Sequence, residues 1–75
     1  MDDPVAEQIR AEMVANVLSL LVASGDTVEP GQPVVIMESM KMEIPVLAEH
    51  GGVVTAVSVA EGDVVQEGDV IVELS

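Results

Sequence analysis

The stretch ANVLSLLVASGDTVEPG, residues 15–31, returns later in the chain as GVVTAVSVAEGDVVQEG, residues 52–68, at an offset of 37 residues (15 to 52). The two copies share the pattern V-x-x-x-x-V-A-x-G-D-x-V-x-x-G, and the match continues from Val34-Val35 to Ile71-Val72. A pattern repeated over this length indicates that the chain folds as two equivalent halves.

Turn residues divide both copies into short segments. Gly25 and Gly62 can adopt the positive φ of a tight turn, and Asp26 and Asp63 can accept hydrogen bonds from their own nearby backbone. We expect the valine two residues after each aspartate to return to the core. β-Branched runs of about four to seven residues between such turns predict an all-β domain.

The first strand of each copy contains a change of side-chain parity. In the first copy the apolar positions are Val17, Leu20 and Val22, and a period of two cannot place all three on one face of a strand. We therefore predict a β-bulge or a sharp bend in this strand and at the same place in the second copy. Two such halves would close into a flattened antiparallel barrel or sandwich with pseudo-twofold symmetry.

The composition limits the classes of function. The 75 residues carry a formal net charge of -12, and Arg10 and Lys41 are the only Lys or Arg side chains. Nucleic acids and anionic membranes are bound through clusters of Lys and Arg, so neither is an expected partner. We recognise no secretion signal and no apolar run of about 18 residues, and the absence of cysteine excludes disulfides and thiolate metal sites. We expect a cytoplasmic protein that is monomeric on its own.

The first 12 residues, MDDPVAEQIRAE, differ in texture from the rest. They contain polar helix-forming residues without a β-strand pattern. Asp2 or Asp3 with Pro4 could begin a helical turn, in which Glu7 would favour the helix dipole. Because a helix this short is only marginally stable, a disordered tail is the alternative. We therefore place the domain at residues 13–75 and treat residues 1–12 as an N-terminal tail.

The stretch Glu38-Ser39-Met40-Lys41-Met42-Glu43 lies between the two copies and contains the single lysine. Shifting it by the repeat length reaches the chain ends, so in a pseudo-twofold barrel it lies at the pole opposite the termini. Val34–Met37 and Ile44–Leu47 are predicted to flank it as strands, and Pro45 restricts the second strand to a sheet edge or to a position that donates no hydrogen bond. Residues 39–42 then form the connecting turn, which predicts Lys41 at an exposed hairpin tip, where another protein can reach it.

This hairpin, set between two G-D-x-V-x-x-G halves, resembles the biotin attachment domain of biotin-dependent carboxylases. Residues 13–75 are most similar to the small free-standing biotinylated proteins of the biotin/lipoyl-attachment family known from actinobacteria. The Met-Lys-Met tripeptide is a specific signal in this context. The resemblance implies a barrel-sandwich hybrid, a flattened barrel of two four-stranded antiparallel sheets with the modified lysine on a β-turn.

The resemblance also implies a function. A biotin protein ligase that recognises the folded hairpin would link biotin as an amide to the ε-amine of Lys41, and Met40 and Met42 would help to present it to partner active sites. The candidate recognition residues are Glu38, Ser39 and Glu43. The chain would be a non-catalytic carrier that shuttles carboxybiotin between biotin carboxylase and carboxyltransferase chains of an acyl-CoA-type carboxylase. It would have no catalytic or metal-binding residues of its own.

Two departures from the family and two alternative functions stay open at this point. Ala15 stands where family members have a glycine, so the bend there is made with a negative φ or is not made in the same way. Asn16 is polar where the second copy has Val53. Lipoyl domains share the fold and the lysine position, but their hairpin typically reads Asp-Lys-Ala, so Met-Lys-Met favours biotin. An interaction module without a modified lysine is the other alternative.

Simpler roles compete with functional ones for several side chains. Lys41 could be an ordinary turn lysine, and Met40 and Met42 could be adaptable apolar surface. Met37 would complete a soft-metal set with these thioethers for Cu(I), but no Cys or His joins it and Met37 is expected in the core. His50, beside two glycines, is expected to be an exposed turn residue and not a general base. A solvated acidic face is expected from Glu61, Asp63, Glu67 and Asp69.

Overall fold

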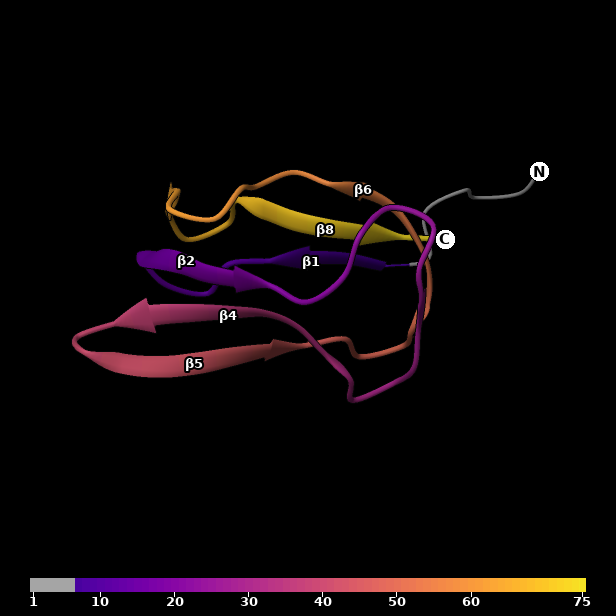
Figure 1. Cartoon of the computed structure of the whole chain (residues 1–75), viewed down its shortest axis with the longest axis horizontal. Helices are drawn as coiled ribbons and strands as arrows, with labels where there is room; N and C mark the ends of the chain where they lie inside the picture. Colours follow the sequence, from indigo (N-terminus) through magenta and orange to yellow (C-terminus); the bar gives the residue numbers. More distant parts are fainter. Residues whose placement is uncertain (1–6) are drawn as a thin grey trace.

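The computed structural model describes residues 7–75, which form eight β-strands in two four-stranded antiparallel sheets (Figure 1). The strands are β1 Glu7–Arg10, β2 Ala15–Leu20, β3 Thr27–Val28, β4 Pro33–Ser39, β5 Met42–Leu47, β6 Gly52–Val57, β7 Val64–Val65 and β8 Val70–Leu74. One sheet has the order β1-β8-β6-β3 and the other β5-β4-β2-β7. The predicted all-β flattened barrel is confirmed, and residues 7–75 contain no helix that could cross a bilayer.

The internal repeat determines both the strand positions and the hydrogen bonds between the halves. Strands β1 to β4 recur as β5 to β8 at the offset seen in the sequence. The N–H of Gly25 donates to the carbonyl of Val54 at 2.8 Å, and the equivalent N–H of Gly62 donates to the carbonyl of Val17 at 2.8 Å. Because equivalent groups bond reciprocally across the molecule, the halves are related by the expected pseudo-twofold symmetry.

Each sheet contains strands from both halves. In the first sheet β8 and β6 of the second half are flanked by β1 and β3 of the first half, and in the other sheet β4 and β2 are flanked by β5 and β7. The edge strand β5 contains Pro45, as predicted, because proline cannot donate to a neighbouring strand. Neither half can complete a sheet without the other.

The bulge predicted in the first strand of each copy is present. The register of β2 against β4 shifts between Val17 and Ser19, and the register of β6 against β8 shifts between Val54 and Ala56, at equivalent positions. An extra residue at a bulge bends its strand and increases its twist. The bend explains how apolar side chains of opposite parity both contribute to one core.

The Gly-Asp turns have the predicted geometry. Gly25 has φ 97° and Gly62 has φ 94°. The Oδ2 atom of Asp26 accepts a hydrogen bond from the N–H three residues before it at 2.9 Å, and Asp63 repeats this contact at 2.9 Å. The valines that follow these turns are buried, as expected: Val28 and Val65.

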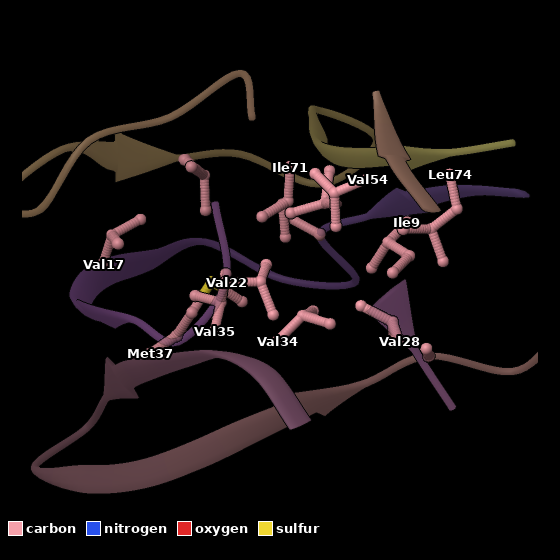
Figure 2. Packing of buried hydrophobic residues seen from close by; sticks show 14 of the residues in the cluster. Ile9, Val17, Val22, Val28, Val34, Val35, Met37, Val54, Ile71 and Leu74 are labelled. Atoms are coloured by element: carbon pink, nitrogen blue, oxygen red, sulfur yellow. The ribbon is translucent and has the colours of Figure 1, made fainter. Parts of the chain in front are cut away.

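The core fills the space between the two sheets (Figure 2). Val17 and Val54, which are equivalent in the repeat, are each 1% exposed, so the burial pattern is duplicated together with the sequence. Because the chain has no aromatic residues, the core consists of branched aliphatic side chains, alanine and one methionine. Its members are Ile9, Ala11, Ala15, Val17, Val22, Val28, Val34, Val35, Met37, Ala48, Val54, Val65, Ile71, Val72 and Leu74.

The predicted boundary between a tail and the domain at residue 13 is wrong for residues 7–12. Glu7–Arg10 form β1, which pairs antiparallel with β8, and Ile9 and Ala11 are buried in the core at 5% and 3% exposure. The physical reason is the repeat: β1 is the first-half equivalent of β5, and Ala11 is equivalent to the buried Ala48. The predicted helical turn around Pro4 lies outside the described residues.

Candidate modification site

Lys41 lies in the two-residue turn that joins β4 to β5. Ser39 and Met42 are register partners, which leaves only Met40 and Lys41 in the turn. Figure 1 shows the tip of this hairpin extending at one end of the molecule, with the C terminus at the other end. The predicted position of Lys41, exposed at a hairpin tip and remote from Ser75, is confirmed.

The backbone of this turn is strained. Met40 has φ 54° and Lys41 has φ 65°, the combination of a type I′ turn, in which Asn-Gly is preferred. The left-handed conformation of a residue with a Cβ atom lowers the stability of the folded state by about 1–2 kcal/mol. Such strain persists only where the flanking structure imposes it, and it concentrates at functional sites. The sequence predicted the turn but not its conformation, because no glycine marks it.

The ammonium group of Lys41 is free within the described part of the chain. Among residues 7–75 it makes no hydrogen bond or ion pair, and its neighbour Met40 is 88% exposed. Met42, on the other side, is also exposed. An amine in this position can be approached from solvent and acylated by a separate protein, once that protein has removed its proton.

The other residues predicted for the site lie on the same hairpin. Glu38 and Glu43 are register partners across β4 and β5, and Ser39 closes the last strand pair before the turn. Met37 is 2% exposed within the core, as predicted. The candidate Cu(I) set of Met37, Met40 and Met42 is therefore divided between the core and the tip.

A hollow of about 230 Å³ lies beside the tip of the hairpin and is lined by Lys41 itself. Asn16 of β2 is the register partner of both Glu38 of β4 and Val64 of β7, so these three side chains form a row on the outer face of the sheet. Val14 completes the hollow from the connection before β2. The sequence analysis noted Asn16 only as a departure and did not single out either valine, because side chains from three separate segments meet here.

A carboxylate away from the tip fixes the connection between β5 and β6. Glu7 accepts hydrogen bonds from the backbone N–H groups of Glu49 at 2.8 Å, His50 at 2.9 Å and Gly51 at 3.3 Å. Burial raises the pKa of the Glu7 carboxyl, but these three donors and the nearby His50 lower it, and the net pKa lies below the usual value. His50 is exposed in this connection, as predicted. Glu7 therefore stabilises a loop and not a helix dipole.

Three of the four residues expected to form a solvated acidic face also bind backbone. Glu61 accepts a hydrogen bond from the N–H of Leu20 at 3.1 Å. Asp63 and Asp69 each accept one from the N–H three residues before them at 2.9 Å. These carboxylates are exposed, but Asp63 and Asp69 stabilise turns of the second half, and Glu61 connects the second half to β2.

Comparison with known proteins places the chain in a family. The family described as "Biotin-requiring enzyme" matches residues 7–74, which include β1 and the Lys41 hairpin. The chain belongs to this biotin/lipoyl family. The match confirms the predicted resemblance and begins at the strand that the sequence analysis had assigned to the tail.

Two relatives show the same small size within the biotin/lipoyl family. The "Biotinylated protein TB7.3 homolog" of Mycobacterium leprae is 54% identical over 71 residues, which cover 95% of this chain and 100% of the relative. The "Biotin/lipoyl attachment protein" of Bacillus subtilis is 49% identical over 67 residues, which cover 89% and 92%.

A solved structure shows the same biotin/lipoyl fold inside a large enzyme. The urea carboxylase of Kluyveromyces lactis matches all of this chain with a TM-score of 0.88 and 35% sequence identity. The matched part is 6% of that carboxylase chain. The similarity confirms the fold.

The Lys41 hairpin fits the cofactor that the biotin/lipoyl family carries. A covalent biotin needs a primary amine that a ligase can reach and that can later enter other active sites. Lys41 is the only lysine of the chain, and it lies exposed on a two-residue turn at the end of a paired hairpin. The family description and the names of its relatives agree with biotin as the predicted cofactor.

Proposed function

We propose that the chain is a non-catalytic carrier of biotin, attached as an amide to the ε-amine of Lys41. One observation carries the proposal: the single lysine of a biotin/lipoyl family member is exposed on a strained two-residue turn at one pole of the barrel. Biotin, when bound, supplies a nitrogen that carries a carboxyl group from one active site to another.

The residues of the chain serve this function by positioning the Lys41 side chain for the ligase. Attachment forms a bond between Nζ of Lys41 and the carboxyl carbon of biotin, with loss of a proton from the amine and departure of AMP from the activated adenylate. The ligase must also supply the base that removes the proton from the amine, because the amine has no hydrogen-bonded base within residues 7–75. The paired strands β4 and β5 hold the backbone of the turn in a fixed place relative to the barrel, so the Lys41 side chain extends from one pole.

The ligase would recognise the folded hairpin. Glu38, Ser39 and Glu43 are the proposed polar contacts, and they lie in the last two register pairs before the turn. Met40 and Met42 provide exposed apolar surface on either side of Lys41 for presenting the cofactor to partner active sites.

The proposed partners are the biotin carboxylase and carboxyltransferase chains of an acyl-CoA-type carboxylase in the cytoplasm. The similarity to a segment of urea carboxylase supports a carboxylase of this general class. A cofactor tethered to a small monomeric barrel has a high effective concentration at both active sites. Capture of the biotinylated chain with its bound proteins, followed by their identification by mass spectrometry, tests the assignment of these partners.

The proposed attachment is tested by a ligase assay. The purified chain is incubated with biotin protein ligase, biotin and ATP, and a parallel sample with a lipoyl ligase and lipoate. Intact mass is measured in both samples, because streptavidin does not bind a lipoyl group. We expect a biotin mass increase and a streptavidin gel shift of the wild-type chain in the first reaction, and no mass increase in the second. Lys41→Arg keeps the charge but removes the acylable amine, so it should give no shift. Lipoylation without biotinylation would replace the proposed function with that of a lipoyl carrier, and an unmodified chain in both reactions would favour an interaction module.

A further inference from the structure

We propose that the hollow beside the tip of the Lys41 hairpin is a resting site for the bicyclic ring of the attached biotin. This inference rests on the proposed function and goes beyond it, because it assigns a binding role to residues outside the hairpin. Lys41 itself lines the hollow, so a group attached to its amine is already adjacent to the surface that would bind it.

The size of the hollow fits a small ring. Its volume of about 230 Å³ corresponds to the liquid volume of about eight water molecules. It is smaller than the pockets of about 300–1,000 Å³ that bind drug-sized ligands, so the contact is weak. Because the ring is tethered, an effective concentration in the range of about millimolar makes a weak contact measurable.

The polar groups of the hollow match the ureido part of biotin. That ring offers N–H donors and a carbonyl acceptor. The side-chain amide of Asn16 can donate to the carbonyl, and the carboxylate of Glu38, its register partner on β4, can accept from an N–H. Within residues 7–75 neither side chain makes another hydrogen bond, so both are available.

Asn16 is not required by the fold. The equivalent position in the second half is Val53, which lies in the same place of the first strand and shows that valine is compatible with this backbone. The amide is present only in the copy whose first strand, β2, begins beside the Lys41 hairpin. Strand formation does not require the polar residue, and a ligand at this pole would give it a role.

The apolar part of the hollow matches the sulfur-containing ring. Val14 and Val64 are 59% and 63% exposed, and both line the hollow together with Asn16, where an apolar group could cover them. Burial of apolar surface contributes about 25 cal/mol per Å². Contact of the ring with these two valines would remove water from both surfaces.

Nuclear Overhauser measurements on the biotinylated chain test the resting site. Intact mass is measured first, and the sample is the full biotinylated chain with labelled methyl groups. We expect contacts between ring protons and the methyl groups of Val14 and Val64. In Asn16→Val these contacts should weaken, and Val53→Asn, the matched change in the other half, should leave them unchanged.

The rate of streptavidin binding gives a second readout that does not depend on activity. Loss of the Asn16 hydrogen bond would free a ring that is docked about half of the time, so the association rate of Asn16→Val should rise about two-fold over wild type. Ring contacts confined to residues 40–42, or equal association rates for both proteins, would overturn the proposal. An unmodified mass would instead overturn the proposed function and the resting site together, so the two failures are distinguishable.

Discussion

Met40 and Lys41 occupy a backbone region in which glycine and asparagine are the usual residues, and they do so in the turn that holds the only lysine. The position of Lys41 could be predicted from the repeat. The hairpin is the part of the chain that the repeat makes equivalent to the chain ends, so it lies at the opposite pole. The left-handed conformation could not be predicted, because neither residue type favours it. Strain at this place indicates that the side chains were kept for function at a cost in stability.

Replacing Lys41 with glycine should therefore stabilise the barrel. Relief of the left-handed strain, offset in part by the greater freedom of glycine in the unfolded chain, predicts a gain of about 1 kcal/mol. For a domain of this size that gain raises Tm by about 4–8 °C in calorimetry. Lys41→Arg keeps the Cβ atom and should melt like wild type, although both variants lose the acylable amine. A lower Tm for Lys41→Gly would contradict the strained turn.

The Glu7 carboxylate predicts a pH dependence of stability. Its pKa in the folded chain is lowered, so the stabilisation is complete above the unfolded value of about 4.3 and is lost as pH falls through the folded pKa. Glu7→Gln should cost about 1–2 kcal/mol at pH 7, because a neutral side chain binds the three N–H groups less strongly. Urea titrations of both proteins should give curves that differ at pH 7 and converge below about pH 4. A constant difference across this range would contradict the loop contact.

At the scale of the element, β1 shows where sequence reasoning failed. Strands β2, β3 and β4 could be predicted because each copy carries valines and Gly-Asp turns, and the bulges followed from the parity of the valines. The sequence of β1, Glu7–Arg10, is mostly polar because an edge strand buries few side chains. Ala11, which the repeat makes equivalent to the buried Ala48, was the sequence signal for this strand.

The contribution of β1 is tested at Ile9. Ile9→Ala removes a side chain that is 5% exposed and leaves a cavity, so it should lower the free energy of unfolding by about 2–4 kcal/mol in a denaturant titration. Gln8→Ala, an exposed position on the same strand, is the control and should change it by less than about 1 kcal/mol. If both changes had equally small effects on the free energy of unfolding, residues 7–12 would be a tail that does not pack on the domain.

Two glycines of the β6 region differ in what surrounds them. A Cβ atom at Gly62, φ 94°, has no atom within 4 Å, so Gly62→Ala should cost only the conformational strain of about 1–2 kcal/mol. At Gly52, φ 139°, the added atom would collide with the carbonyl oxygen of Ser75, which accepts a hydrogen bond from Val53 at 3.1 Å. Gly52→Ala should therefore lower Tm further than Gly62→Ala. The reverse order would contradict the pairing of the C terminus.

For the whole molecule, the repeat explains both the stability and the position of the site. Each sheet takes two strands from each half, so the halves interlock and a single core forms between the sheets. The two-sheet fold, and the position of the hairpin at one pole of the barrel, could be predicted from the repeat. The row of Val64, Asn16 and Glu38 could not be predicted, because it depends on register between strands that lie far apart in the chain.

The central claim is that the pole of the barrel presents Lys41 as the acceptor of biotin. Tandem mass spectrometry of the intact chain, produced together with a biotin protein ligase, tests it most directly because it identifies the modified residue. We expect a single biotin, with the mass increase confined to fragments that contain Lys41, the only lysine of the sequence. A biotin on fragments that lack Lys41, or a chain without added mass, would contradict the claim.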